Sequence, residues 1–369
     1  MPVHRYANPL TIHWGPGCVR ERLEDELRAV GATRVLLVTT RSAAANPRLA
    51  SAVEAVIGGR LAGRFERIGQ HAPAASIMEA VEAARAARAD GLVSLGGGSP
   101  IDAAKAVAFS LATGLDLRLP DAPARARRAA LSRVLPHVAI PTTLSAAEMS
   151  ANAGFSAEGT REKVGVSAPA LTAAAVLYDA ELAVHTPLPL WLSTGIRAVD
   201  HAAETLLAPG EHPLPDVASL EALRRLKAGL LAARAAPDAL APRTECQLGA
   251  WLSMLLPGPA SKGLSHTLGK RLGSRHGIPH GVTSCLLLPH VLRYLYLTPR
   301  APEAAARIAE ALGVRDAADG VAELIAQLGL PRHLSEWNLS DADLVEAARA
   351  VATAEHPEAD LLAILRAAW

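Results

Sequence analysis

One segment, GLVSLGGGSPIDAAK from Gly91 to Lys105, constrains the fold of this chain more than any other part of the sequence. It begins with an apolar run that predicts a buried strand, and it continues directly into three glycines. Ser99 then predicts a helix cap, with Pro100 at the first helical position. Consecutive glycines let the backbone approach a ligand closely, and the start of a helix presents unpaired N–H groups to an anion. The segment therefore predicts a pyrophosphate seat formed by Gly96, Gly97, Gly98 and Ser99, with Asp102 in the following turn.

Short apolar runs alternate with helical patterns through the first half of the chain. Residues 34–38, 91–95 and 138–140 are typical of strands, and residues 76–89 have the apolar spacing of a helix. Strands that are separated by helices need crossover connections, so they predict a mostly parallel sheet that is covered on both faces. We therefore expect an α/β dinucleotide-binding domain over residues 1–179.

The second half of the chain has a different pattern. After about Asp179 alanine and leucine dominate, and helical periodicity appears at residues 217–234, 244–256, 302–312 and 342–352. We predict an α/β N-terminal domain with a mostly parallel sheet, followed by an all-α C-terminal domain. This second domain, residues 180–369, is expected to supply the substrate-binding and catalytic residues.

The charge balance and the composition exclude several classes of partner. Lys and Arg total 37 against 36 for Asp and Glu, so nothing in the charge favours nucleic acid or an anionic membrane surface. Aromatic residues make up only 3% of the chain, which disfavours stacking platforms for unpaired bases. The cysteines are far apart, and no apolar stretch is long enough to span a bilayer. We expect a cytoplasmic homodimer that acts on a small molecule, without nucleic-acid or membrane partners.

Two further loops are predicted to line the cofactor, because they also follow strands. Thr142 and Thr143 come directly after the run at residues 138–140 and offer hydroxyls to a phosphate or a ribose. Thr40 lies at the end of the first strand, where a carboxylate commonly accepts the ribose 2′-hydroxyl. No carboxylate stands there and Arg41 follows, so a 2′-phosphate is tolerated as well. The expected cofactor is therefore NAD or NADP.

Four motifs resemble, in sequence and in order, the iron-containing (group III) alcohol dehydrogenases: GGGSPIDAAK, PTTLSAAE, GIRAVDHAAE and GLSHTLGKRLGSRHGIPHG. His71, in an HxP setting, and the passage from Leu177 to Gly210 are similar to the maleylacetate reductase branch of that family. Asp102 matches the alcohol dehydrogenase pattern better. The resemblance implies a dinucleotide-binding domain followed by a helical domain. It also implies that Lys163 reaches the cofactor.

The same resemblance implies a metal site, but two residues depart from it. Metal-dependent members hold a divalent cation with one Asp and three His, and the matching histidines are His201, His266 and His280. Arg197 stands at the position of the Asp, and Lys270 stands where a further His is usual. A guanidinium only donates hydrogen bonds and cannot ligate a cation. We therefore expect no metal; if one binds, the three histidines are its ligands.

Asp200 is the carboxylate nearest to these positions in the sequence. As the immediate neighbour of His201 on a helix, it is expected to point about a quarter turn away and not to replace the missing ligand. Arg197 has an alternative, structural role as the ion-pair partner of Asp200 or Glu204. Lys270 has the alternative of a solvated surface lysine.

The favoured function is hydride transfer from NAD(P)H to a small substrate with a carbonyl group and a negative charge, such as a maleylacetate-like oxoacid. Without a metal, cationic and imidazole side chains would stabilise the developing alkoxide and supply the proton. The candidate catalytic residues are Arg197, His201, His266, Lys270 and His280. One alternative is a non-redox enzyme that catalyses an elimination, isomerisation or cyclisation in a cationic, metal-free pocket. Another is a binding or regulatory subunit, against which the complete glycine loop argues.

Overall fold

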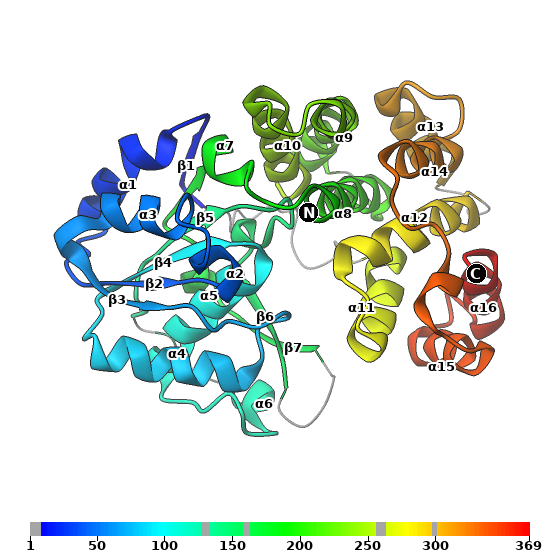
Figure 1. Cartoon of the computed structure of the whole chain (residues 1–369). Helices are drawn as coiled ribbons and strands as arrows, with labels where there is room; N and C mark the ends of the chain where they lie inside the picture. Colours follow the sequence, from blue (N-terminus) through cyan, green and yellow to red (C-terminus); the bar gives the residue numbers. More distant parts are fainter. Residues whose placement is uncertain are drawn as a thin grey trace. The chain divides into compact units, whose positions relative to one another are not determined.

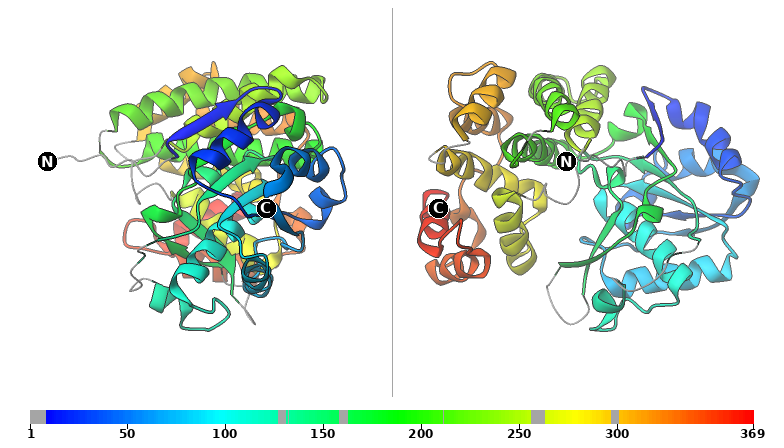
Figure 2. Two further views of the ribbon diagram at one scale, coloured as in Figure 1. Left: turned by 90° about the vertical axis from the view of Figure 1, so that its left-hand side faces the viewer. Right: turned by 180° about the vertical axis from the view of Figure 1, so that it is seen from behind.

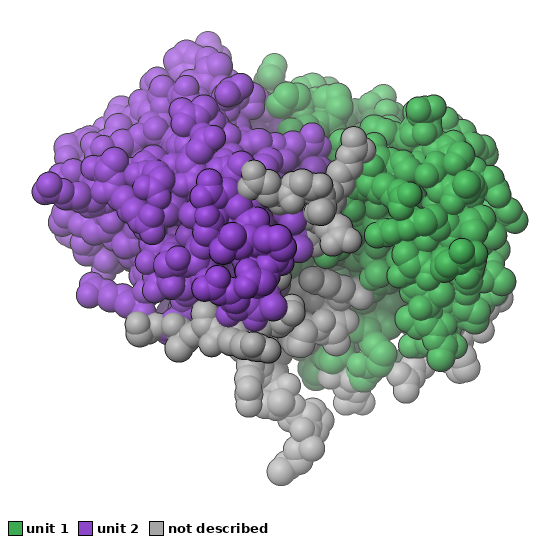
Figure 3. All heavy atoms as spheres, turned by 90° about the horizontal axis from the view of Figure 1, so that it is seen from below, with its two compact units in different colours: residues 1–5, 187–369 green, residues 6–186 purple. Residues whose placement is uncertain are grey.

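The structure, a computed structural model, describes residues 9–126, 131, 133–157, 163–210, 212–255, 263–296 and 301–369. The chain forms two compact units that divide between Thr186 and Pro187, and Figure 3 colours them separately. We call the part built on a parallel sheet (purple, labelled unit 2 in Figure 3) the first unit, because it comes first in the chain. The helical part (green, labelled unit 1) is the second unit. The predicted fold class, an α/β domain followed by an all-α domain, is confirmed.

A six-stranded sheet forms the centre of the first unit. All its neighbouring strands are parallel, and they lie in the order β1-β8-β5-β4-β2-β3 (Figure 1). The strands are β1 (Thr11–Trp14), β2 (Val35–Val38), β3 (Leu61–Phe65), β4 (Gly91–Gly96), β5 (His137–Pro141) and β8 (Ala175–Tyr178). An antiparallel pair lies apart from this sheet and consists of β6 (Asn152–Ser156) and β7 (Lys163–Ser167). The three strands predicted from the sequence are β2, β4 and β5.

Helices cover both faces of the sheet (Figures 1 and 2). Val35 and Leu37 of β2 share a core with α1 and α3, whereas Leu36 and Val38 share a core with α4 and α5. Burial on both faces explains why these strands are apolar at consecutive positions rather than at every second one. The helices of this unit are α1 (Cys18–Ala29), α2 (Arg41–Ala44), α3 (Ala50–Ile57), α4 (Ala74–Ala86), α5 (Gly98–Thr113), α6 (Ala122–Ala126) and α7 (Ala180–Ala183).

The second unit is organised around α8, which packs against α9, α10, α11, α12 and α13. Every residue of α8 from Trp191 to Leu206 is buried, so the polar groups it carries need partners inside the protein. The helices are α8 (Leu188–Leu207), α9 (Pro213–Ala235), α10 (Leu240–Ser253), α11 (Leu264–His276), α12 (His280–Leu295), α13 (Ala301–Leu312), α14 (Ala317–Leu328), α15 (Asp341–Val351) and α16 (Glu358–Ala367). Among the described residues, no helix combines the length and the apolar character needed to cross a bilayer.

Candidate functional site

The carboxyl ends of β2, β4 and β5 are neighbours in the sheet, and they bring three predicted cofactor loops together. Thr40 follows β2, the glycine loop follows β4, and Thr142 follows β5. The Thr142 backbone N–H donates to the Gly96 carbonyl at 2.8 Å, which joins the last two loops directly. Open parallel sheets bind their ligands at this edge. The sheet order therefore gathers the predicted residues where such a ligand is expected.

The three glycines form the turn from β4 into α5. Gly96 has a φ of +137°, a conformation that other residues rarely adopt. A β-carbon on Gly97 would lie 3.1 Å from the Thr143 side chain, and one on Gly98 would lie 3.1 Å from Ser145 Oγ. The glycine loop thus packs closely against the loop from Pro141 to Glu148, which we call the threonine loop. Residues 97–99 stay partly exposed, so the first turn of α5 can present its unpaired N–H groups to an anion.

Ser99 does not cap α5, and this prediction from the sequence was wrong. The N-cap is Gly97, and no side chain caps the first turn. Ser99 lies inside the helix, where its Oγ accepts a hydrogen bond from the His71 backbone N–H at 3.1 Å. His71 has a φ of +61°, in the left-handed region that costs an ordinary residue roughly 1–2 kcal/mol. The serine therefore anchors a distant, strained loop, while a glycine adopts the extended conformation of the cap.

Ser145 offers a hydroxyl to the glycine loop that the sequence did not single out. Its Oγ is buried and has no hydrogen-bond partner in the described part of the chain. Because buried hydroxyls are nearly always bonded, this atom is a candidate contact for a phosphate or a ribose. Thr143 faces Gly97 in the same way, whereas the Thr142 carbonyl accepts a hydrogen bond from Thr186 Oγ1 at 2.6 Å. Ser145 reaches the glycine loop because the threonine loop passes beside Gly98, and this contact could not be predicted from the sequence.

Lys105 fastens the threonine loop and the residues that follow it to α5. Its side chain is fully buried, and Nζ donates to the carbonyls of Ala147, Ser150 and Asn152 at 2.6, 2.8 and 3.0 Å. Three acceptors satisfy the three donors of an ammonium group. Asp102 Oδ1 lies 3.8 Å from Nζ. Burial lowers the pKa of Lys105, and Asp102 opposes that shift. Lys105 is therefore a structural link between the two loops.

For two other residues predicted to bind the cofactor, Thr40 and Lys163, the structure does not show a cofactor-binding role. Thr40 caps the short helix α2, where its Oγ1 accepts a hydrogen bond from Ala43 N at 3.3 Å. The hydroxyl thus has a local structural role, and its contact with a ribose stays a prediction. Lys163 is the first residue of β7, but its side chain lies outside the described residues.

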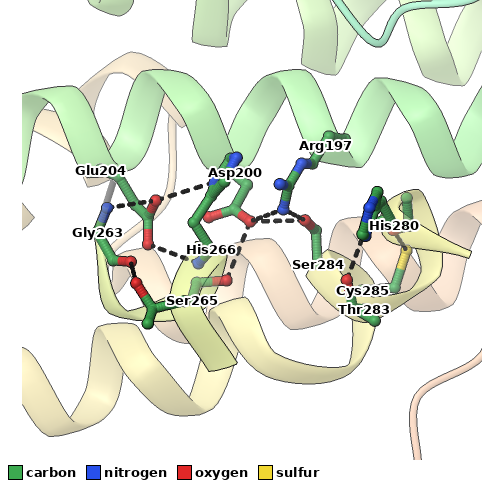
Figure 4. Close-up of polar contacts among 12 residues, drawn as sticks. Arg197, Asp200, Glu204, Gly263, Ser265, His266, His280, Thr283, Ser284 and Cys285 are labelled. Atoms are coloured by element: carbon green, nitrogen blue, oxygen red, sulfur yellow. Dashed lines mark hydrogen bonds and ion pairs between the residues drawn. The ribbon is translucent and has the colours of Figure 1, made fainter. Parts of the chain in front are cut away.

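A second cluster of polar residues lies in the helical unit, along one side of α8 (Figure 4). Arg197, Asp200 and Glu204 follow one another at spacings of three and four residues, which places them on one face of a helix. All three are buried. Buried charges are costly unless they are paired and hydrogen-bonded, so the partners of these residues define the site.

Asp200 joins three helices. Its Oδ2 accepts hydrogen bonds from Ser265 Oγ of α11 at 3.0 Å and from Ser284 Oγ of α12 at 2.6 Å. Arg197 Nη1 lies 3.4 Å from the same oxygen and donates to Ser284 Oγ at 3.0 Å. Gly281 permits this approach, because a β-carbon there would lie 2.7 Å from the backbone of α8. The alternative considered for Arg197, an ion pair with Asp200, is thus present.

Glu204 holds the start of α11. Its Oε2 accepts a hydrogen bond from Gly263 N at 3.0 Å, and its Oε1 accepts one from His266 N at 3.1 Å. A carboxylate in this position satisfies unpaired N–H groups and faces the positive end of the helix dipole. The His266 ring also lies close, with Nδ1 3.2 Å from Oε2. Burial raises the pKa of Glu204 to about 7, against the lowering effect of these backbone bonds and of Arg197.

His201 and His266 lie against each other, with ring centroids 5.0 Å apart. His201 is 8% exposed, and its Nδ1 bonds to none of the described residues. Burial lowers the pKa of His201 well below its usual range, and the neighbouring His266 and Arg197 add to this effect. His201 is therefore neutral at neutral pH, with one ring nitrogen able to donate and the other able to accept.

His280 and Lys270 lie away from the centre of the cluster. His280 is the first residue of α12, and in Figure 4 it lies on the Arg197 side, away from Glu204. Lys270 follows His266 by one turn of α11, and its side chain is exposed. The structure thus brings Arg197, His201 and His266 together, places His280 beside them, and leaves Lys270 at the surface.

Asp200 was expected to lie a quarter turn from His201, and its contacts are with other residues of the cluster. One ligand atom from each of Asp200, Glu204 and His266 lies within 4.8 Å of the other two. The prediction compared Asp200 with its neighbour in the sequence, whereas its partners come from α11 and α12. The cluster is consequently not simply cationic, because two carboxylates offset the charge of Arg197. The spacing of three and four residues between Arg197, Asp200 and Glu204 was the sequence signal that could have identified the two carboxylates as part of the site.

Comparison with known families and proteins covers both units. Residues 9–180 match the family model described as iron-containing alcohol dehydrogenase. Residues 191–366 match the model described as Fe-containing alcohol dehydrogenase family, C-terminal. A maleylacetate reductase from Pseudomonas sp. (strain P51) is 33% identical over 352 residues, which cover 95% of this chain and 92% of that protein.

Solved structures with similar sequences have the same fold. A putative alcohol dehydrogenase from Ralstonia eutropha JMP134 superposes with a TM-score of 0.86 at 30% identity, covering 100% of this chain and 98% of the other. The maleylacetate reductase from Agrobacterium tumefaciens superposes with a TM-score of 0.84 at 29% identity, covering 100% of this chain and 99% of the other.

Proposed function

The chain belongs to the iron-containing alcohol dehydrogenase family, and we propose that it is an NAD(P)H-dependent reductase of a small anionic carbonyl substrate. Membership of this family makes it an NAD(P)-dependent oxidoreductase. A maleylacetate-like oxoacid is the substrate class that we favour. The main support for this substrate class is the hydrogen bonding of Arg197, which leaves part of its guanidinium available.

Arg197 is bound at one nitrogen only. Its Nη1 contacts Asp200 and Ser284, whereas Nε and Nη2 make no hydrogen bond with any described residue. The side chain is 11% exposed. Nε and Nη2 form the edge by which a guanidinium binds a carboxylate in a bidentate manner. A rigid guanidinium with this edge available suits an anionic substrate.

The α/β unit would hold the cofactor on the residues already described. The first turn of α5 would bind the pyrophosphate, and the hydroxyls of Thr143 and Ser145 would face the same ligand. The absence of β-carbons at Gly97 and Gly98 lets the threonine loop lie directly against the glycine loop. Lys105 would act indirectly, because its three bonds keep the threonine loop in place.

A bound reduced nicotinamide would supply a hydride for the substrate, either at the carbonyl carbon or at a double bond conjugated with it. Negative charge then collects on the carbonyl oxygen, and one proton is taken up. The products are the oxidised cofactor and the reduced substrate. Arg197 would stabilise the negative charge, and His266, whose ring lies beside the Glu204 carboxylate, would supply the proton.

The divalent metal of the family does not fit the residues of this cluster, and we propose a metal-independent mechanism. The Arg197 guanidinium lies against the Asp200 oxygen that accepts both serine hydroxyls. Both oxygens of Glu204 accept backbone hydrogen bonds at the start of α11. Asp200, Glu204 and His266 are close enough to share an ion. Their two carboxylates, however, already have other partners, and a cation adjacent to them repels a second cation.

Purified protein is expected to oxidise NADH and NADPH in the presence of maleylacetate. The two cofactors should differ by less than about tenfold in kcat/KM, or roughly 1.4 kcal/mol. Acetaldehyde, a neutral carbonyl compound, should be a much poorer substrate because it offers no carboxylate to Arg197. Loss of reduced-nicotinamide fluorescence measures each rate. Consumption of maleylacetate without any cofactor would favour the non-redox alternative, and cofactor binding without turnover would contradict a reductase.

Protein purified without a chelator is expected to contain well under one equivalent of iron or zinc, and its activity should survive EDTA. At about 4 Å, a guanidinium opposes a divalent ion by several kcal/mol even at an effective dielectric near 20. Elemental analysis of the purified protein provides the measurement. The variant Arg197→Asp is the matched comparison and should bind more metal. A stoichiometric metal whose removal abolishes activity would contradict the mechanism.

A further inference from the structure

We infer that Asp200 is a positioning residue, which orients the Arg197 guanidinium through Ser284 so that its free edge meets the anionic substrate. This inference rests on the proposed function, because it concerns the same substrate. It assigns to Asp200 a role in substrate binding although Asp200 itself cannot reach the substrate.

The direction of the hydrogen bonds carries the first step. Ser284 Oγ donates to Asp200 Oδ2 at 2.6 Å, and a carboxylate can only accept. The hydroxyl has a single proton, so Ser284 must accept the bond from Arg197 Nη1 at 3.0 Å. The Asp200 carboxylate therefore orients the Ser284 O–H group, and the Ser284 oxygen in turn accepts a hydrogen bond from Nη1 of Arg197 (Figure 4).

The burial of Asp200 carries the second step. Its exposure is 0%, and its Oδ1 has no hydrogen-bond partner among the residues that the structure describes. The donors from α8, α11 and α12 all converge on Oδ2 instead. An acidic group enclosed in this way does not touch a substrate, so any effect it has on binding must pass through Arg197.

The planar shape of the guanidinium carries the third step. Because the group is rigid, holding Nη1 at Ser284 also determines where Nε and Nη2 point. Those two nitrogens have no partner among the described residues. Asp200 thereby orders the anion-binding edge before the substrate arrives, which reduces the entropy lost on binding.

A purely structural role is the competing explanation, since Asp200 also holds α8 to α11 and α12. The two explanations predict different results in a double-mutant cycle, which measures whether two residues act through each other. The cycle consists of wild type, Asp200→Asn, Arg197→Met and the double variant. Each protein is assayed with maleylacetate and NADH, and NADH binding is titrated by fluorescence.

Asp200→Asn is expected to raise KM for maleylacetate by about tenfold, the size of effect that follows when a charged hydrogen-bond partner is lost. The Kd of NADH should stay within about twofold of wild type. In the Arg197→Met background the same substitution should cost less than about twofold more, because the residue it positions is already gone. Additive losses in the double variant, or a wild-type KM in Asp200→Asn, would overturn the inference.

Ser284→Ala provides a second measurement if Asp200→Asn does not fold. It should raise KM in the same direction, because it removes the bridging hydroxyl and leaves only the longer direct contact of 3.4 Å between Asp200 and Arg197. Ser253→Ala removes another buried hydroxyl of the helical unit, one that bonds only Ala250 O, and should leave KM unchanged. Equal effects of both serine variants would point to a general loss of stability and contradict the inference. A wild-type protein without reductase activity would overturn the proposed function, whereas an active wild type with additive losses would overturn only the role of Asp200.

Discussion

Arg197→Met is expected to lower kcat/KM for maleylacetate by about 10²- to 10³-fold, the loss typical of removing one preorganised donor from a developing oxyanion. Methionine is similar in length but carries neither the charge nor the N–H groups that face the substrate. The Kd of NADH should not change, because the residues expected to bind the cofactor lie on the glycine and threonine loops of the other unit. Steady-state kinetics combined with a fluorescence titration of NADH separates the two effects.

Two further variants show whether the geometry or only the charge of Arg197 matters. Arg197→Lys keeps the charge but has no planar edge, so an intermediate loss of about tenfold is expected. Arg224→Met removes an arginine whose side chain is 52% exposed on α9, and it should leave both constants unchanged. If Arg197→Met retains activity within about threefold of wild type, the guanidinium is not the group that meets the substrate.

Gly97→Val is expected to weaken binding of NADH and NADPH by about 100-fold, or roughly 2.7 kcal/mol. The φ of Gly97 is −81°, which any residue can adopt, so backbone strain does not contribute. The β-carbon would instead lie 3.1 Å from Thr143, so valine would displace the threonine loop that is expected to line the pyrophosphate. Isothermal titration with each cofactor measures the change, and thermal unfolding shows whether the fold is retained.

Gly59→Val is the matched control for this substitution. No atom lies within 4 Å of the position of its β-carbon, and it is far in the sequence from the glycine loop. Binding of both cofactors should therefore stay within about twofold of wild type, a difference of less than 1 kcal/mol. Gly97→Ala should fall between the two valine variants, because a methyl group crowds Thr143 less. Unchanged cofactor affinity in Gly97→Val would show that the dinucleotide does not lie over this loop.

The fold was largely accessible from the sequence because its signals are local. The apolar runs that became β2, β4 and β5 are buried on both faces, which makes them uninterrupted and easy to recognise. The edge strand β1 was not predicted, since its residues are only partly buried and its pattern is correspondingly weak. Helix α8 was placed only through the family motif that contains Arg197 and His201, and not from the spacing of its apolar residues.

The glycine loop was determined by the sequence alone, and the proposed replacement of a metal-ligand Asp by Arg197 also rests on the sequence. A strand that leads through glycines into a helix forms an anion seat from neighbouring residues, whatever the rest of the chain does. The partners of Ser99 and Asp200 were decided only by the tertiary structure. Ser99 binds a loop before α4, and Asp200 binds hydroxyls from α11 and α12, all distant in the sequence. Burial decides which partners these side chains have, because a polar group removed from water must form hydrogen bonds with the groups that tertiary packing places next to it.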